Sequence, residues 1–313
     1  MRNKAYLGVD CGSASVKMAL IDEEENLIDS CYFRNSGITE TIKKGLEKLA
    51  GNENDYEIKG VGTTGSGRGL SKVMLGGDLV KTEIFAHVIG TLKYHKDARV
   101  ISDIGGEDSK LMMLNEGILE DFVLNNSCSA GTSSSLEAIA TRMGVKIEDV
   151  GDLALKSTKK LNISTKCGIF MTSEAINFLN SGAKKEDILW GVVNGMVSNY
   201  LTMAQGKDLQ PPHIYTGMPS RNKAIVKAFN EQLGYEIIVP EHSPIMGAIG
   251  SAIIVCNNPP EKTKFKGFEI ADIDYQTEIR TATGCENNCQ ITDLYQQGVY
   301  LGSIGNRCEK CVK

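Results

Sequence analysis

The stretch Asp10-Cys11-Gly12-Ser13-Ala14-Ser15-Val16-Lys17 has a counterpart 93 positions later, Asp103-Ile104-Gly105-Gly106-Glu107-Asp108-Ser109-Lys110. In both, an aspartate ends an apolar run, a glycine-containing turn follows, and a lysine stands seven positions after the aspartate. Internal repetition of this kind indicates a duplicated domain rather than a solenoid, because only two copies are present. We therefore predict two related α/β lobes with a cleft between them.

The elements around these two stretches follow the same order, which extends the repeat. Alternating apolar residues predict three strands and then a helix, and the same order begins again at Val100. The expected strands are 5–10, 16–21, 27–33, 100–103, 109–114 and 118–124, and the expected helices begin at 39 and near Cys128. Breaker residues at 257–260 mark a further boundary. We predict lobe I at 1–96, lobe II at 97–255 with a last helix that can return to lobe I, and a tail at 256–313.

Composition and charge describe an ordinary protein with one unusual feature. The chain has 313 residues, 34 of them basic and 39 acidic, so its net charge of −5 gives no basic surface for nucleic acid. No apolar run reaches the roughly 18–20 residues that span a bilayer, and the N-terminus lacks the apolar core of a secretion signal. We expect a cytoplasmic protein with no nucleic-acid or membrane partner. Nine cysteines, an odd number in a reducing compartment, point to metal or redox chemistry rather than disulfides.

An aspartate followed by a glycine-containing hairpin has a clear use in phosphate chemistry. The glycine lets backbone N–H groups approach phosphate oxygens closely, and the carboxylate can hold Mg²⁺ through water. One such turn is common in any protein. Two copies in matching lobes, each with its lysine, favour a protein that grips one phosphate chain from both sides.

Two other glycine-containing stretches were compared with nucleotide motifs. The stretch 215–222, Tyr-Thr-Gly-Met-Pro-Ser-Arg-Asn, suits an adenosine as a strand-loop-helix rim. The stretch 62–69 is not a P-loop, because Arg68 stands where that motif needs a lysine. We expect a flexible loop there, opening a helical stretch at 70–96.

Three further stretches, taken with these elements, carry a family resemblance. They are Thr64-Gly65-Ser66-Gly67-Arg68, Asn125-Asn126-Ser127-Cys128-Ser129-Ala130-Gly131-Thr132 and Ser164-Thr165-Lys166-Cys167-Gly168-Ile169-Phe170-Met171-Thr172-Ser173-Glu174. Over about residues 5–255 the chain resembles the superfamily of actin, sugar and acetate kinases and heat-shock chaperone ATPases. Within it, the chain is similar to the activator ATPases (component A) of 2-hydroxyacyl-CoA dehydratases and to the ATP-binding subunits of benzoyl-CoA reductases. This implies an α/β fold of two duplicated actin-like (ribonuclease H-like) lobes with a nucleotide cleft, extended here by a small Cys₄ tail module.

The resemblance also implies roles for particular residues. Asp10 would hold Mg²⁺-bound water, Asp103 would lie in the second phosphate hairpin, and Glu107 would orient the attacking water. The residues implied to contact ATP or ADP are Gly12, Ser13, Ala14, Ser15, Lys17, Gly105, Gly106, Gly131, Thr132, Gly217 and Asn222. The sequence departs from the family at Glu107, where glutamine is usual, and at Met218, where a second glycine is common. These departures affect the position of the attacking water and the space beside the nucleoside.

Cys128 and Cys167 each stand just before a predicted helix, where the helix dipole stabilises a thiolate. A [4Fe–4S] cluster needs four thiolates, so two chains related by a two-fold axis would complete the set. The resemblance implies one such cluster per homodimer. It further implies a hydrolase that uses ATP to drive a low-potential electron from a ferredoxin or flavodoxin into an iron–sulfur dehydratase or reductase, in an anaerobic cytoplasm.

The tail carries four cysteines in two pairs. Cys285 and Cys289 precede a hairpin predicted at 290–303, and Cys308 and Cys311 follow it. Two cysteine pairs presented by a hairpin resemble a zinc ribbon, and a second Fe–S cluster uses the same ligands. We favour zinc, because small ribbons of this kind are mostly structural.

Two other classes of function fit part of the sequence. A small-molecule kinase would share the fold, but it leaves the cysteines at 128 and 167 without a role. A non-catalytic nucleotide sensor that docks through its metal-binding tail is the other class. ATP hydrolysis without an added substrate separates both from an activator ATPase.

Overall fold

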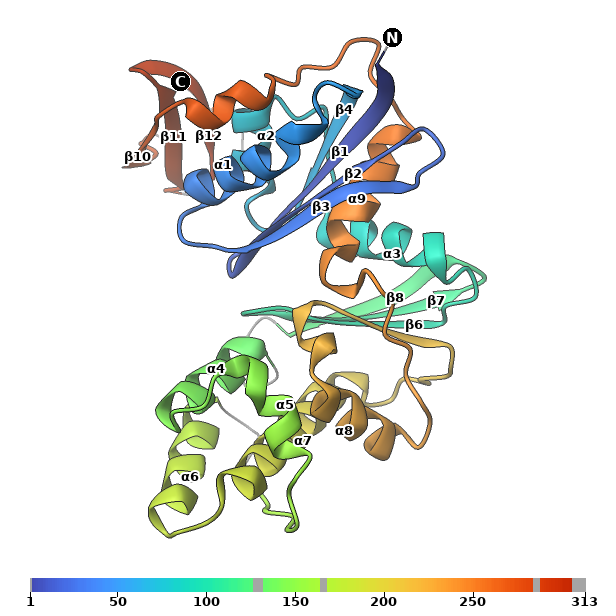
Figure 1. The fold of residues 1–313 in the computed structure, drawn as a ribbon, viewed down its shortest axis with the longest axis vertical. Helices are drawn as coiled ribbons and strands as arrows, with labels where there is room; N and C mark the ends of the chain where they lie inside the picture. The colour runs from blue at the N-terminus through green and yellow to red at the C-terminus, as the bar shows by residue number, and fades with distance from the viewer. Residues whose placement is uncertain (1, 126–131, 164–167, 284–287, 306–313) are drawn as a thin grey trace. The chain divides into compact units, whose positions relative to one another are not determined.

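The structure is a computed structural model that describes residues 2–125, 132–163, 168–283 and 288–305. The chain forms two compact units: unit 1 contains Met1–Gly90 and Gly247–Lys313, and unit 2 contains Thr91–Met246. Each unit is built on a sheet of its own (Figure 1). Each also has its own hydrophobic core. This division differs from the three parts expected from sequence, because residues 247–313 all group with the first unit.

Unit 1 is built on a five-stranded sheet in the order β3-β2-β1-β4-β5. Its strands are β1 (Asn3–Cys11), β2 (Ser15–Ile21), β3 (Leu27–Arg34), β4 (Tyr56–Thr64) and β5 (Leu79–Val80). The first three form the predicted antiparallel meander, and β4 and β5 run parallel to β1. The sequence analysis missed β4, because Gly60 and Gly62 hide the alternating apolar pattern of a strand.

Helices cover both faces of this sheet (Figure 1). α1 (Ile38–Leu49) and α2 (Arg68–Leu75) pack on the face that carries Leu7, Val9 and Cys11. On the other face lies α9 (Met246–Cys256), which approaches so closely that a Cβ on Gly8 would meet the Ala248 carbonyl oxygen at 2.0 Å. Side chains alternate along a strand, so Asp10 shares the α9 face with Gly8.

The helical stretch expected at 70–96 is two helices with a short strand between them. After α2 the chain enters β5 and then α3 (Glu83–Tyr94). α3 packs on α9 through small residues, since a Cβ on Gly250 would lie 1.8 Å from the Ala86 carbonyl oxygen. The tight contact places the side chains of α3 beside the first turns of α9.

Unit 2 repeats the strand plan of unit 1. Its sheet has the order β8-β7-β6-β9. The strands are β6 (Val100–Ile104), β7 (Ser109–Asn115), β8 (Ile118–Asn125) and β9 (His213–Thr216). β6, β7 and β8 form an antiparallel meander, and β9 runs parallel to β6 as β4 does to β1. The duplication predicted from the two hairpins is confirmed, although a single parallel bridge from Ile214 to Ile238 replaces a fifth strand.

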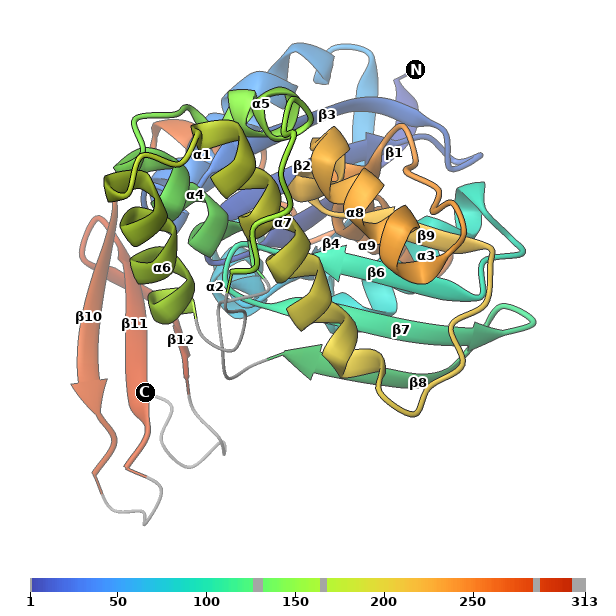
Figure 2. The ribbon, with the colours of Figure 1, turned by 90° about the horizontal axis from the view of Figure 1, so that it is seen from below.

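The core of unit 2 lies between its sheet and a group of five helices. Its helices are α4 (Ser133–Arg142), α5 (Val150–Ala154), α6 (Gly168–Asn180), α7 (Lys185–Leu201) and α8 (Lys223–Leu233). α7 packs against the other four (Figure 2), and the Tyr200 hydroxyl at its end donates to the Lys110 carbonyl oxygen at 2.8 Å. Single 3₁₀ turns occur at Ala50–Asn52, Ile147–Asp149, Thr202–Ala204, Met218–Arg221, Ser243–Ile245 and Phe268–Asp272.

The C-terminal residues form a three-stranded antiparallel sheet that belongs to unit 1 (Figure 2). The central strand β11 (Gln290–Gln296) pairs with β10 (Tyr275–Thr281) and with β12 (Val299–Ile304), and β11 and β12 are the predicted hairpin. Leu294 lies in the same buried cluster as the residues of α1 and β1. β12 covers α2, where a Cβ on Gly69 would lie 3.2 Å from the Ile304 side chain. The tail is therefore packed on the core of unit 1.

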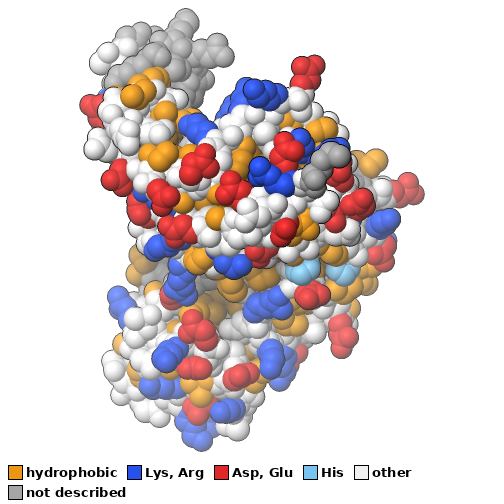
Figure 3. Space-filling model, turned by 45° about the horizontal axis from the view of Figure 1, so that its top comes forward, with side chains coloured by type: hydrophobic (Ala, Val, Ile, Leu, Met, Phe, Trp, Pro, Cys, Tyr) orange, Lys and Arg blue, Asp and Glu red, His pale blue; other side chains and the backbone are white. Residues whose placement is uncertain are grey.

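Charged side chains of both signs are interspersed over the face of the molecule shown in Figure 3. This distribution follows from the near balance of 34 basic and 39 acidic residues, and it leaves no single-sign patch on that face. Within the described residues, every helix is too short or too polar to cross a bilayer.

Candidate functional site

The first phosphate hairpin lies at the carboxyl end of β1 in unit 1. Asp10 pairs with Lys17 across the hairpin, and the Lys17 Nζ lies 3.1 Å from Asp10 Oδ2. The Asp10 side chain is only 5% exposed, so the lysine offsets the charge of a buried carboxylate. Asn35 closes the turn, since its Nδ2 donates to the carbonyl oxygens of Gly12 at 3.1 Å and Ser13 at 2.9 Å. The sequence analysis did not identify Asn35.

The tip of this hairpin is suited to a phosphate group. Ser13 and Ala14 are exposed there, while Ser15 is buried and its carbonyl oxygen accepts from the Gly12 N–H at 2.9 Å. A Cβ on Gly12 would lie 3.2 Å from the Ser15 carbonyl oxygen, so a side chain at this position would press on the hairpin backbone. All five residues that the resemblance assigned to phosphate contact in unit 1 thus lie on one hairpin.

The stretch 62–69 packs on this hairpin, which corrects the expectation of a flexible loop. Gly65 has φ +85°, and a Cβ there would lie 2.4 Å from the Cys11 carbonyl oxygen and 2.7 Å from Asp10 Oδ1. The Gly67 N–H donates to the same Cys11 carbonyl at 2.7 Å. Glycine is required here because the loop touches the hairpin backbone, not because the loop must move.

Helix α9 presents its first turn to Asp10. A Cβ on Gly247 would lie 2.8 Å from Asp10 Oδ2 and 3.0 Å from His87 Nε2. The amino end of a helix favours negative charge through its dipole and its N–H groups. Nothing local in the sequence indicates that α3 carries His87 to the Asp10 site.

The second phosphate hairpin lies in unit 2 and has the same acid–base pair. Asp103 is opposite Lys110, whose Nζ lies 3.5 Å from Asp103 Oδ2 and 3.0 Å from Asp108 Oδ1. The Gly105 N–H donates to the Asp108 carbonyl oxygen at 2.9 Å. Glu107 is exposed at the tip. This hairpin therefore holds its lysine between two carboxylates.

The second hairpin is tied to the start of α4. The Ser133 and Ser134 N–H groups donate to the Gly105 and Gly106 carbonyl oxygens, both at 3.1 Å, and the Ser133 hydroxyl donates to Gly105 at 3.0 Å. Thr132 is the buried N-cap residue of α4. A movement of the hairpin would therefore be transmitted to α4.

The third element, at the end of β9, joins this second hairpin. The Thr216 hydroxyl donates to Asp103 Oδ1 at 2.9 Å, and Gly217 has φ +87° with the Ile104 carbonyl oxygen 2.4 Å from where its Cβ would stand. Asn222, assigned to adenosine by the resemblance, caps α8: its Oδ1 accepts from the N–H groups two and three residues later. Met218 is 39% exposed.

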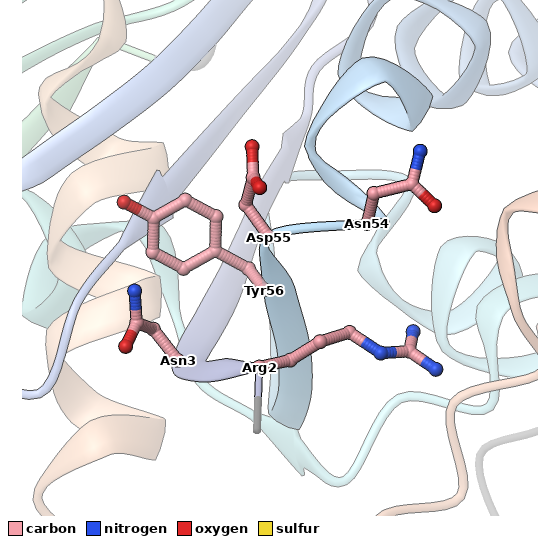
Figure 4. A pocket seen from close by; sticks show the side chains of 5 residues that line it. All are labelled: Arg2, Asn3, Asn54, Asp55 and Tyr56. Carbon is pink, nitrogen blue, oxygen red and sulfur yellow. The ribbon is translucent and has the colours of Figure 1, made fainter.

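A surface depression lies at the opposite end of the first sheet from Asp10 (Figure 4). It is lined by Arg2, Asn3, Asn54, Asp55 and Tyr56, at the amino ends of β1 and β4. Ligands of open α/β sheets bind at the carboxyl ends of the strands. The depression is therefore separate from the hairpin site.

Comparison with known proteins identifies the family of the chain that carries these two hairpins. Residues 7–255 match the BadF/BadG/BcrA/BcrD ATPase family. The chain belongs to this family. It is an ATPase, as the sequence predicted, and residues 256–313 lie beyond the family match.

Several relatives of this ATPase are named as activators of dehydratases. It is 31% identical over 263 residues to the 2-hydroxyisocaproyl-CoA dehydratase activator of Clostridioides difficile, covering 82% of this chain and 97% of the relative. It is 28% identical over 251 residues to the (R)-2-hydroxyglutaryl-CoA dehydratase activating ATPase of Acidaminococcus fermentans, covering 79% and 95%. The solved structure of the activator of the 2-hydroxyisocaproyl-CoA dehydratase from Clostridium difficile with bound ADPNP has a TM-score of 0.77 at 30% identity, covering 81% and 95%. The predicted family and actin-like fold are confirmed.

Most of the cysteines that the sequence predicts as metal ligands lie outside the described residues. These are Cys128, Cys167, Cys285, Cys308 and Cys311, together with Gly131. Among the described residues, there is no group of three or more His, Cys, Asp or Glu side chains that could hold a metal ion. Of the predicted ligands, Cys289 alone is described, and its side chain is 6% exposed beside Ala282 and Ile291.

Two other cysteines of the ATPase, Cys11 and Cys31, are buried in the core of unit 1. Burial raises the pKa of the Cys11 thiol to about 12 and that of the Cys31 thiol to about 11. A thiol at these pKa values is protonated at neutral pH and a poor metal ligand or nucleophile. Cys11 and Cys31 are therefore poor candidates for metal ligands.

A buried histidine makes the stability of unit 2 depend on pH. His213 has Nε2 2.7 Å from the Ser102 hydroxyl and Nδ1 3.1 Å from the Tyr235 hydroxyl, and burial lowers its pKa from 6.5 to about 4. His213 therefore takes up a proton near pH 6.5 in the unfolded chain, but only near pH 4 in the folded chain. We expect unfolding free energy to fall by about 3 kcal/mol across this window as pH decreases.

Urea unfolding of the ATPase between pH 4 and pH 7.5 measures this dependence. The His213→Gln variant should lose most of the slope, whereas the partly exposed control His95→Gln should keep it. Equal slopes in the wild type and His213→Gln would show that other groups control the pH dependence.

Proposed function

We propose that this ATPase is the activator of an iron–sulfur dehydratase or related reductase, and that ATP hydrolysis drives a low-potential electron into that partner. The observation that carries the proposal is the family match over 7–255, a span that contains both hairpins together with Cys128 and Cys167. Relatives matched over most of their length are named as dehydratase activators. A ferredoxin or flavodoxin would be the electron donor in the cytoplasm.

Mg²⁺·ATP would be held by the two hairpins. In unit 1, the buried Asp10, its partner Lys17 and the first turn of α9 suit a phosphate chain with a water-bound Mg²⁺. In unit 2, Asp103 and its hairpin would also bind the phosphate chain of ATP. The exposed Glu107 would orient the attacking water. The remaining proposed contacts are Gly12, Ser13, Ala14, Ser15, Gly105, Gly106, Gly131, Thr132, Gly217 and Asn222.

Two copies of the chain would share one [4Fe–4S] cluster, each supplying Cys128 and Cys167. When bound, the cluster supplies a one-electron carrier whose potential its surroundings set. The chain's own contribution is the link from the second hairpin to α4, because Ser133 and Ser134 bind the hairpin carbonyls and α4 follows the stretch with Cys128. A nucleotide with different affinity for two positions of this hairpin would shift α4 between them.

The tail would hold Zn²⁺ at Cys285, Cys289, Cys308 and Cys311. The described part of this proposed site is compatible with a structural metal, since Cys289 directly precedes β11, which is packed on the core of unit 1. A structural zinc would then fix the ends of the hairpin. A second Fe–S cluster on the same four cysteines is the alternative.

Metal analysis of anaerobically purified protein tests the proposal. We expect about two iron atoms, a matching amount of acid-labile sulfide and about one zinc per chain, because one cluster is shared by two chains. About six irons without zinc would place a second cluster in the tail. Zinc without iron, in protein kept strictly anaerobic, would contradict the activator function.

A further inference from the structure

We propose that Thr64 is a further ligand-binding residue of the first hairpin, and that its hydroxyl hydrogen-bonds an oxygen of the Mg²⁺–phosphate assembly beside Asp10. The inference rests on the proposed binding of Mg²⁺·ATP at Asp10. The stretch 64–68 is part of the family resemblance, but the resemblance implies no role for Thr64.

The position of Thr64 in the sheet places its side chain on the Asp10 face. Thr64 ends β4 and lies opposite Asp10 in the parallel pair of β4 with β1. The preceding Thr63 faces α2, since its hydroxyl donates to the Arg68 carbonyl oxygen at 3.1 Å. Successive side chains alternate, so Thr64 points to the other face, which carries α9.

The glycines of β4 confirm this direction. A Cβ on Gly62, two residues before Thr64, would lie 2.3 Å from the Ser251 carbonyl oxygen of α9. A Cβ on Gly60 would lie 2.7 Å from the Val255 side chain, one turn further along the same helix. β4 therefore runs antiparallel to α9, and its end at Thr64 lies toward the start of α9, where Gly247 approaches Asp10 Oδ2.

The Thr64 hydroxyl has no hydrogen-bond partner within the described chain. The residue is fully buried, and its Oγ1 makes no bond there. Buried hydroxyl groups are normally paired, and an unpaired one costs stability unless a ligand or water pairs with it. Thr91 Oγ1 is also buried and unpaired, so this property alone defines no site. What distinguishes Thr64 is its place opposite Asp10.

The duplicated unit shows what the equivalent hydroxyl does when it is paired. Thr216 lies opposite Asp103, as Thr64 lies opposite Asp10, and each threonine is followed by a glycine of nearly equal φ, +87° at Gly217 and +85° at Gly65. In unit 2 the hydroxyl donates to Asp103 Oδ1 at 2.9 Å. In unit 1 the equivalent bond is not made. The hydroxyl of unit 1 is thereby left for a ligand at the same carboxylate.

Calorimetric titration of the anaerobically purified full chain with ADP and with a non-hydrolysable ATP analogue tests the proposal. Thr64→Val removes the hydroxyl at nearly constant volume, and we expect binding in Mg²⁺ to weaken on the order of ten- to a hundred-fold, the loss of a hydrogen bond to a charged group. Thr64→Ser, which keeps the hydroxyl, should bind within about three-fold of wild type. Thr91→Val, the matched control, should bind as wild type does.

Three results separate the outcomes. Unchanged binding by Thr64→Val, or equal weakening in Thr64→Ser, would overturn the role of the hydroxyl. If Asp10→Asn also binds like wild type, the proposed nucleotide site fails as well; if it loses affinity while Thr64→Val does not, only the role of Thr64 fails. Repeating the titration without Mg²⁺ identifies the bonded atom, because a contact to Mg²⁺-bound water disappears there and a contact to a phosphate oxygen persists.

Thermal melts provide a readout that a structural role would not move. Without nucleotide, Thr64→Val should melt at or slightly above the wild-type temperature, since an unpaired buried hydroxyl is replaced by a methyl group of the same shape. With saturating Mg²⁺ and analogue, its melting temperature should rise less than that of wild type. A large loss of stability without nucleotide, together with a full nucleotide-induced shift, would mean that Thr64 serves packing only.

Discussion

The Cys128→Ala variant is expected to contain almost no iron, while it still binds nucleotide. A [4Fe–4S] cluster shared by two chains would lose two of its four thiolates in this variant, and two thiolates do not hold such a cluster. Iron content should fall from about two atoms per chain to near zero, and electron transfer to a partner enzyme should be abolished. Iron analysis and the visible absorption of anaerobic protein measure the loss, and nucleotide titration measures what remains.

A matched cysteine variant controls for damage to the fold. Cys31→Ala removes a thiol from the core of unit 1, where burial keeps it protonated, so iron content should match wild type. Cys167→Ala should behave as Cys128→Ala does. A variant at position 128 that keeps full iron and the wild-type spectrum would rule out Cys128 as a ligand.

Asp10→Asn is expected to reduce ATP hydrolysis about 10²- to 10³-fold, which is the usual cost of removing a group that stabilises charge in the transition state. The carboxylate is buried against Lys17 and beside the first turn of α9, and an amide in its place cannot hold a hydrated Mg²⁺ as firmly. Release of inorganic phosphate from Mg²⁺·ATP, without an added substrate, measures the effect. Circular dichroism should show an unchanged fold.

An ion pair between the same sheet and α1 provides the control for Asp10. Asp29 pairs with Lys48 at 3.2 Å, but it lies on β3, away from the hairpin tip. Asp29→Asn should therefore hydrolyse ATP within about three-fold of wild type, because partly exposed ion pairs contribute little. Equal rates in both variants would remove Asp10 from the site.

The first three strands of each unit and the hairpins between them could be predicted from the sequence, because their signals are local. Alternation of apolar residues defines β1, β2 and β3. The spacing of Asp10 and Lys17 is that of two residues opposite each other in a β-hairpin. The same local rules apply to the second copy. The repeat then predicted that the second unit has the same run of three strands as the first.

The rest of the site could not be predicted, because it depends on contacts between distant segments. Asn35 reaches the hairpin from the end of β3, and His87 and Gly247 reach Asp10 from two helices that meet only in the folded chain. The glycines of β4 look like loop residues in sequence. Their role becomes clear only where α9 presses on the strand.

The packing of β12 on α2 limits how this chain can differ from shorter members of its family. Ile304 lies against Gly69, and a Cβ on Gly302 would lie 3.2 Å from the Val73 side chain. A member that ended soon after α9 would leave this outer side of α2 open to water, and natural selection would favour polar side chains there. Small or apolar residues at these positions of α2 are therefore expected to accompany the extension, and in a new genome sequence they would indicate a member that carries it.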